Sequence, residues 1–196
     1  MQNSLLYERK IIDMDYTLEN GRPQNTNGRL KKEIKVYDYL DNLSIQYDRV
    51  DHPPFDTMED CAETDKLLGV STVKNLLLCN SQKTEFYMLI MPADKKFKTK
   101  ELSKQIGSAR LSFASGEHME KLLDITPGSL TILGLINDPK KRVRLLIDRD
   151  VCESEYIVAH PCINTSSLRI KTSDILGVFL PSLGRDAIFV DLIGEE

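Results

Sequence analysis

Two short apolar runs separated by a brief polar turn constrain the fold more than any other feature of this sequence. The runs are VKNLLLCN (73–80) and EFYMLIMP (85–92), and the turn between them is SQKT (81–84). Both runs have the length of a β-strand. Because parallel neighbours need a crossover of about a dozen residues or more, strands this closely joined pair as antiparallel neighbours. The sequence therefore predicts a β-hairpin over 73–92.

Strand and helix patterns intermix along the rest of the chain. Strands are expected at 44–52, 110–115, 143–148, 156–161, 166–171 and 187–193, and helices at 29–43, 56–69, 99–106, 116–123 and 172–183. Many of these strands are also too closely joined for parallel crossovers. We therefore expect an α/β fold with a mixed, mainly antiparallel sheet and helices packed around it.

The N-terminal residues differ in composition from the rest of the chain. Residues 1–28 show no regular pattern, and NGRPQNTNG (20–28) is rich in Asn, Gly and Pro, which is typical of a tether. A chain of 196 residues has the length of one ordinary domain with a short extension. We expect 1–28 to be a flexible extension and 29–196 to be the folded domain.

The sequence carries no pattern of a membrane span or a secretory signal. No apolar stretch approaches the roughly 18 residues that a bilayer helix requires. The N-terminus lacks a positive segment followed by a long apolar one. The four cysteines include no CxxC pair and stand at positions 61, 79, 152 and 162. This pattern favours reduced cysteines and a cytoplasmic protein without a membrane partner.

Common catalytic signatures are missing from the chain. It contains no GxSxG, no HExxH, no P-loop and no GxGxxG ahead of a helix. The three histidines, His52, His118 and His160, have no partners at metal-ligand spacing. We therefore expect neither a metal nor a cofactor.

Charge is distributed unevenly. The formal net charge of −4 disfavours a protein that coats DNA, yet residues 95–110 hold six basic residues and one acid. Such a patch can bind phosphates, and the alternative is a solvated helix face. Aromatic residues make up 7% of the chain and tryptophan is absent, so no stacking platform for single-stranded bases is expected.

Three stretches invite a functional interpretation. Lys74 heads a leucine-rich strand, where its ammonium either extends to solvent or points into a cleft. TPGSLTILGLIND (126–138) contains a Gly-Ser turn, which can present N–H groups to an oxygen or can simply reverse the chain. In AHPCINTSSLRI (159–170), His160 stands beside small polar residues, where a histidine serves either a structural or a catalytic role.

Four motifs in chain order resemble the YbaK/prolyl-tRNA-synthetase-associated domain family, and in particular its freestanding editing branch of the PrdX or ProXp-ala kind. The motifs are KNLLL (74–78), GSARLSFAS (107–115), TPGSLTILGLIND (126–138) and HPCINTSSLRI (160–170). The resemblance covers about residues 30–193. It implies the family fold, which is a single α/β domain with a mixed, barrel-like sheet.

The resemblance also implies an activity, that of a trans-editing aminoacyl-tRNA deacylase. Such proteins hydrolyse the ester of misacylated proline tRNA, typically the one that carries alanine. Lys74 and His160 match the family's pocket lysine and the histidine of its HP motif, and are the implied catalytic residues. The implied substrate-binding residues are Asn75, Gly128, Ser129, Leu130, Thr131 and Ile132.

One position departs from the family pattern. The family's loop has the form GxxxP, whereas this chain has Ile132 in place of the proline. Because proline fixes φ, its absence alters the shape of the loop and hence the size of the pocket. The same fold acting on cysteine- or serine-charged tRNA is therefore an alternative to alanine editing.

The implied partners are the acceptor end of proline tRNA and prolyl-tRNA synthetase, and no DNA. The lysines expected to contact tRNA phosphates are Lys95, Lys96, Lys98, Lys100 and Lys104. The alternative from another class is a non-catalytic module that senses aminoacyl-tRNA or a free amino acid. The joint presence of Lys74, Asn75, Gly128 and His160 favours the enzyme.

Overall fold

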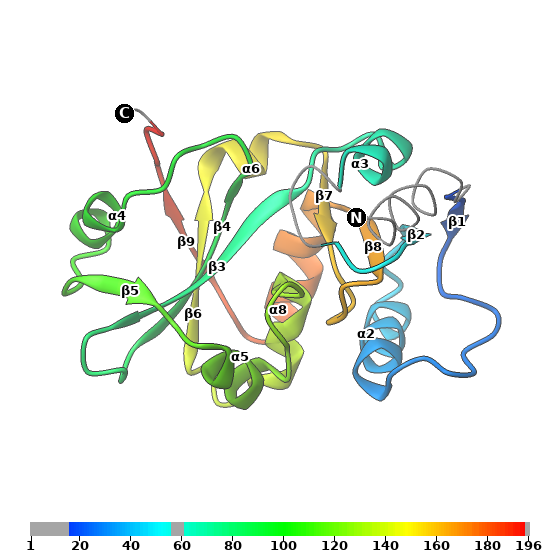
Figure 1. Ribbon diagram of the computed structural model, residues 1–196, viewed down its shortest axis with the longest axis horizontal. Coiled ribbons are helices and arrows are strands. Elements are labelled where there is room, and N and C mark those ends of the chain that lie inside the picture. Colours follow the sequence, from blue (N-terminus) through cyan, green and yellow to red (C-terminus); the bar gives the residue numbers. More distant parts are fainter. Residues whose placement is uncertain (1–15, 56–60, 195–196) are drawn as a thin grey trace, which may run out of the picture.

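The computed structural model describes residues 16–55 and 61–194 and is shown in Figure 1. Its strands are β1 (Leu18–Asn20), β2 (Tyr47–Asp51), β3 (Val73–Asn80), β4 (Phe86–Pro92), β5 (Leu111–Phe113), β6 (Val143–Asp148), β7 (Tyr156–Ala159), β8 (Ser166–Lys171) and β9 (Ala187–Val190). Its helices are α2 (Lys31–Asn42), α3 (Ala62–Leu68), α4 (Thr99–Gln105), α5 (Gly116–Leu123), the 3₁₀ helix η2 (Ile132–Asn137), α6 (Arg149–Glu153), α7 (Thr172–Asp174), the π-helical turn η3 (Ile175–Phe179) and α8 (Leu180–Ser182).

The described strands form two sheets. The first has the order β1-β2-β8-β7, and all of its neighbours are antiparallel. The second has the order β5-β3-β4-β6-β9, with antiparallel pairs on one side of β4 and parallel pairs on the other. The hairpin predicted over 73–92 is the β3–β4 pair. The α/β class and the mixed sheet are thus confirmed.

A single barrel-like sheet is not found among the described strands. β3 and β7 approach each other, but no described ladder joins the two sheets. Each sheet instead ends on two edge strands, β1 and β7 in the first and β5 and β9 in the second. The sheets are held together by side-chain packing, because Tyr47 and Leu168 of the first and Leu77 and Leu145 of the second belong to one core cluster.

Helices cover both sheets (Figure 1). α2 packs its buried side against the first sheet, where the ring of Tyr37 stacks on that of Tyr47 in β2 at 5.9 Å. α4 lies at the other end of the molecule and places Leu102 in a second core cluster with Leu78 and Leu146. α3 ends at Gly69, whose φ of +66° closes the helix as expected. The expected start of that helix, 56–60, lies outside the described residues.

The segment before residue 29, expected to be a flexible extension, is part of the fold where it is described. Residues 18–20 form β1, which pairs with β2 in the first sheet. Arg49, almost completely buried, forms ion pairs with Glu19 of β1 and with Asp51. An arginine buried in this way needs its carboxylate partners. The sequence pattern missed this strand because β1 has three residues, all exposed.

Candidate active site

A pocket lies beside the first half of β3, where the described strands pair with it on one side only. β5 pairs with Leu78, Cys79 and Asn80, so among the described strands none pairs with the other edge of β3 from Val73 to Leu76. The pocket at this open edge has a volume of about 330 Å³. Its described lining residues are Phe55, Cys61, Thr72, Val73, Lys74, Asn75, Leu76, Met119, Pro127, Gly128, Leu130, His160 and Asn164.

The leucines of β3 anchor the strand on both of its faces. Successive side chains of a strand point to opposite faces, and Leu77 and Cys79 accordingly join the core between the sheets. Leu76 and Leu78 join the second cluster, beneath α4. By the same alternation, Lys74 belongs to the α4 side of the sheet and the side chain of Asn75 to the side of the shared core.

Lys74 is partly buried at the pocket, and its ammonium is held in place. The Nζ atom donates a hydrogen bond to the backbone carbonyl of Lys95 at 3.1 Å. When His160 is neutral, Lys74 is the only charged side chain among the described residues that line the pocket. Its ammonium is therefore the positive group that the described lining presents to a ligand.

Lys95, which holds Lys74 through its carbonyl, is itself held by two carboxylates. Its Nζ contacts the carboxylate of Asp148 at 3.0 and 2.9 Å and that of Asp150 at 2.8 Å. These carboxylates raise the pKa of Lys95 against the opposing effect of its burial. Asp148 is completely buried and also accepts the backbone N–H of Asp150 at 3.1 Å. The chain from Asp148 through Lys95 thus fixes the position of the Lys74 ammonium.

The backbone of Asn75 faces the open edge of β3. The Leu77 carbonyl accepts the N–H of Ala114 at 2.8 Å on the β5 side. The N–H and C=O groups of a strand alternate between its two edges with a period of two residues, so those of Asn75 point to the same side as those of Leu77. Because β5 does not reach Asn75, these groups point toward the pocket.

The loop across the pocket is shaped by Gly128. Its φ is +87°, a conformation that residues with a side chain rarely adopt. A Cβ atom at this position would also lie 3.2 Å from Nδ2 of Asn164. Asn164 in turn donates to the carbonyl of Phe55 at 2.7 Å and accepts the N–H of Phe55 at 3.4 Å. Asn164 therefore lies close to the Gly128 loop while it is hydrogen-bonded to the segment after β2.

His160 lies at the end of β7 and is partly exposed to the pocket. Its Nδ1 donates to the carbonyl of Ser166 at 3.0 Å, so in the neutral ring Nε2 is left as a hydrogen-bond acceptor. Burial lowers the pKa of His160 despite the hydrogen bond to Ser166. The backbone N–H of His160 donates to Oγ1 of Thr131 at 3.2 Å, which ties the histidine to the Gly128 loop.

A second histidine stands behind His160 and was not singled out from the sequence. His52 donates from Nδ1 to the carbonyl of Pro53 at 2.7 Å, and its Nε2 lies 2.9 Å from Oγ of Ser167. Burial lowers the pKa of His52 to about 4. The ring stacks on Phe55 at 3.9 Å. A second His-Pro pair, at 52–53, was the signal in the sequence that could have identified it.

The pocket does not collect all the residues predicted to bind substrate. Lys74, Asn75, Gly128, Leu130 and His160 line it, whereas Ser129, Thr131 and Ile132 do not. Ser129 is buried beside an adjoining pocket of about 400 Å³. Thr131 caps η2 by accepting the N–H of Leu133 at 3.3 Å.

Ile132 lies in the core between the sheets and is 1% exposed. Ile132, which stands where the family has proline, therefore affects the pocket only through its packing in the core.

The five lysines predicted to contact tRNA do not share one environment. Lys95 forms the internal ion pairs described above. Lys96 and Lys98 are exposed in the segment between β4 and α4, and Lys100 and Lys104 are exposed on α4. The structure thus separates Lys95, which supports the pocket, from the four lysines at the surface.

Metal clusters and membrane-spanning helices are both absent from residues 16–55 and 61–194. No group of three or more His, Cys, Asp or Glu side chains is arranged there to hold a metal ion. None of the helices in this part of the chain has both the length and the apolar character needed to cross a membrane.

Comparison with known sequences identifies the family. The model of the aminoacyl-tRNA editing domain matches residues 52–178, a range that includes every described residue of the pocket lining. The chain is 30% identical over 136 residues to the prolyl-tRNA editing protein ProX of Acetoanaerobium sticklandii, covering 69% of this chain and 83% of that protein. The chain therefore belongs to the aminoacyl-tRNA editing domain family, as its motifs indicated.

More distant relatives cover most of the chain. It is 28% identical over 156 residues to prolyl-tRNA synthetase associated domain-containing protein 1 of Mus musculus, which covers 78% of this chain and 91% of the mouse protein. A solved structure described as that of a candidate trans-editing enzyme for prolyl tRNA synthetase superposes with a TM-score of 0.62. Its sequence identity is 16%, and the match covers 85% of this chain and 99% of the other. This structural similarity, at low sequence identity, shows that the two proteins share a fold.

Proposed function

We propose that this protein hydrolyses the ester of misacylated proline tRNA, with alanine as the preferred amino acid. The observation that carries the proposal is the pocket at the open edge of β3. It brings one ammonium (Lys74), one unpaired strand edge (Asn75), one glycine turn (Gly128) and one histidine (His160) around a single cavity. Membership of the editing-domain family and the names of the relatives support the same reaction class.

The chemistry needs little from the protein, because an aminoacyl ester is already activated. Water adds to the carbonyl carbon, the bond to the ribose oxygen breaks, and the proton from water passes to that oxygen. The products are the free amino acid and uncharged tRNA. The main task of the site is to stabilise the negative charge that develops on the carbonyl oxygen, for which fixed donors are effective.

Two groups of β3 are placed for that task. The Lys74 ammonium is a compact positive charge that the carbonyl of Lys95 holds in position. The backbone N–H of Asn75 points to the same pocket from the open edge of the strand. The Gly128 loop offers further backbone donors across the cavity. Since the leucines hold β3 rigidly from both faces, these donors need no rearrangement during the reaction.

His160 has a different role in this proposal. Its lowered pKa keeps the ring neutral at neutral pH. With Nδ1 donating to Ser166, Nε2 is an acceptor for the α-ammonium group of the substrate or for a hydroxyl of the terminal ribose. That hydroxyl assists the attack of water in this proposal, so the reaction needs neither a protein nucleophile nor a cofactor.

Selectivity follows from the apolar side chains of the pocket. Val73, Leu76, Met119 and Leu130 line it, and close packing against them excludes a larger amino acid more strongly than a smaller one. We propose that alanine enters and proline is excluded. Cysteine and serine, which are close to alanine in size, remain the alternative substrates.

The partners follow from the substrate. The acceptor end of proline tRNA is the proposed ligand, and the exposed lysines from Lys96 to Lys104 are its proposed phosphate contacts. Prolyl-tRNA synthetase, which supplies the substrate, is the proposed protein partner. The proposed location is the cytoplasm, where tRNA is charged.

The test uses proline tRNA charged separately with Ala, Cys, Ser and Pro. Loss of each ester is followed for the wild type and for Lys74→Ala. We expect rapid loss of alanine and little loss of proline. The Lys74→Ala variant is expected to be slower by at least about tenfold, which corresponds to about 1.4 kcal/mol of transition-state stabilisation.

The outcomes separate the alternatives. Faster loss of cysteine or serine than of alanine would keep the reaction and change the substrate. If the wild type leaves all four esters intact while it still binds the tRNA, the protein is a sensing module and the hydrolase proposal fails. A Lys74→Ala variant as fast as wild type would remove the lysine from the mechanism.

A further inference from the structure

Two aromatic side chains meet on the α4 side of the second sheet. The rings of Phe97 and Phe113 lie 6.1 Å apart at an angle of 68°, although the residues come from different segments of the chain. Phe97 is partly buried in the second core cluster, whereas Phe113 on β5 is 63% exposed. Leaving most of a large apolar ring in water is unfavourable. An exposed ring supported from behind by a second one is available for stacking with a flat partner.

The aromatic pair is continuous with the pocket. Leu76 lines the pocket and packs in the same cluster as Phe97. Phe113 lies opposite Leu78 in the β3–β5 ladder. From Lys74 to Leu78 the strand rises by about 13 Å, at roughly 3.3 Å per residue. That distance corresponds to about four stacked nucleotides at 3.4 Å each, or to fewer in an extended strand.

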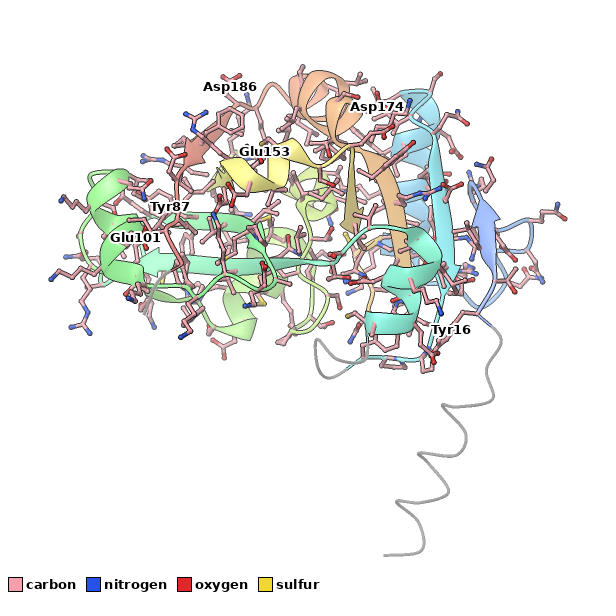
Figure 2. The ribbon with its side chains drawn as sticks, turned by 90° about the horizontal axis from the view of Figure 1, so that it is seen from above. Tyr16, Tyr87, Glu101, Glu153, Asp174 and Asp186 are labelled. Carbon is pink, nitrogen blue, oxygen red and sulfur yellow. The ribbon has the colours of Figure 1, made fainter. Side chains whose placement is uncertain are left out.

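Positive charge borders the aromatic pair. Lys98 follows Phe97 directly, and Arg110 stands immediately before β5, with both side chains exposed. α4, which packs against β5, adds the exposed Lys100 and Lys104. Glu101, the single acid among residues 95–110, accepts the backbone N–H of Ile193 at 2.8 Å. Figure 2 shows Glu101 at the end of the molecule away from Tyr16, which marks the position of α4.

We propose that Phe97 and Phe113 form a stacking surface for the unpaired 3′ end of the tRNA whose ester occupies the pocket. This inference rests on the proposed function. Aromatic rings bordered by cations bind single strands because each base has a face to stack and each phosphate a charge to neutralise. Leu76 borders both the pocket and the cluster that holds Phe97, so the bases that precede the esterified adenosine are the part of the RNA placed to reach this surface.

The test measures binding of an uncharged RNA hairpin with the acceptor-stem sequence of proline tRNA, made with and without its unpaired CCA end. Fluorescence anisotropy gives the affinity for wild type, Phe113→Leu, Phe113→Tyr and Phe189→Leu. Phe189 is the matched control, because it is 41% exposed on the opposite edge strand, β9. Phe113→Leu is expected to weaken binding of the CCA-ended hairpin about tenfold, or about 1.4 kcal/mol.

The remaining variants and the second hairpin complete the expected result. Phe113→Tyr and Phe189→Leu bind like wild type, and the hairpin without CCA binds equally to all four proteins. Hydrolysis of 3′-alanyl-adenosine, which has no preceding bases, is unchanged in Phe113→Leu. This last reaction separates the two proposals, because wild type that leaves this small ester and alanyl-tRNA intact fails as a hydrolase whatever its RNA binding.

Two results would overturn the stacking surface. One is equal affinity of wild type and Phe113→Leu for the CCA-ended hairpin. The other is an equal loss of affinity for both hairpins, which would show that the substitution disturbs the lysines rather than a base contact. A change of sedimentation in Phe113→Leu, with RNA binding intact, would assign the exposed ring to a contact between protein chains.

Discussion

The two halves of β3 have the same backbone conformation and opposite roles. From Leu77 to Asn80 the strand is buried, and at Leu78 and Cys79 it pairs with β4 on one side and with β5 on the other. From Val73 to Leu76 it is partly exposed and has β4 on one side and the pocket on the other. The second half supplies packing energy. The first half supplies a charged side chain and unpaired backbone groups whose positions the second half fixes.

In the proposed function, this difference lets a chain without the common catalytic motifs carry out chemistry. When one edge of a strand is paired over only part of its length, the unpaired part exposes its N–H and C=O groups. The buried half of the strand keeps these groups rigid. The donors then need no loop to position them. Substitutions in the two halves are accordingly expected to separate stability from activity.

The largest expected effect is on stability, in the buried half. Leu78→Ala removes a completely buried side chain and is expected to lower the free energy of unfolding by about 2–5 kcal/mol. Lys74→Ala, four residues earlier, removes one hydrogen bond of a partly buried side chain and is expected to lower it by no more than about 1.5 kcal/mol. Urea denaturation measures both. Similar losses in the two variants would contradict the division of the strand.

The stability of the protein is expected to depend on pH through His52, whose ring stacks on the pocket residue Phe55. His52 has a folded-state pKa of about 4, below the value of about 6.5 for an unfolded chain. The unfolded chain therefore binds a proton first as the pH falls. The stabilisation that comes from the neutral His52 is complete above pH 6.5. It is lost between pH 6.5 and 4, by up to about 3 kcal/mol.

Thermal unfolding at a series of pH values measures this loss. His52→Gln is expected to reduce the slope between pH 6.5 and 4. Part of the slope remains in the variant, because the pKa of His160 is also lowered. A slope unchanged from wild type would show that His52 is not the group that titrates.

A smaller effect is expected from the carboxylates behind Lys74. Asp148→Asn removes the buried charge that holds Lys95, and is expected to cost about 1–3 kcal/mol of stability. It should also slow ester hydrolysis, by less than Lys74→Ala does, because Lys74 contacts the Lys95 carbonyl and not the ion pair itself.

Asp150→Asn is the matched control, since the Asp150 carboxylate also pairs with Lys95 but is 55% exposed. Pairs in contact with water contribute little, so this variant is expected to keep both stability and rate. Urea denaturation and the alanyl-tRNA hydrolysis assay measure the two effects. Equal rates for Asp148→Asn and Asp150→Asn would show that the buried carboxylate does not position Lys74.

Much of the fold follows from local patterns. The β3–β4 hairpin was predictable because its runs are apolar and its turn is short, and α2 follows from the apolar periodicity of residues 29–43. The arrangement of the strands in two sheets was not predictable, because it depends on which strands become neighbours across the chain. β1 was missed because its three residues are exposed and are ordered by contacts with β2 and Arg49.

The candidate site was also predictable only in part. Motifs pointed to Lys74, Asn75, Gly128 and His160, and the structure brings these four residues to one pocket. The motifs could not show that Ile132 is in the core or that Lys95 is ion-paired, because burial and partners depend on distant segments. The Phe97–Phe113 contact is another example, since composition alone argued against an aromatic surface.

The most direct test of the account is to map where a stable substrate analogue binds. Amide NMR spectra would be recorded during titration with 3′-alanylamido-adenosine, in which an amide replaces the ester. We expect the largest shifts at Lys74, Asn75 and Gly128 and small shifts at Leu78 and Cys79. Large shifts confined to other parts of the chain, with Asn75 and Gly128 unmoved, would contradict this expectation.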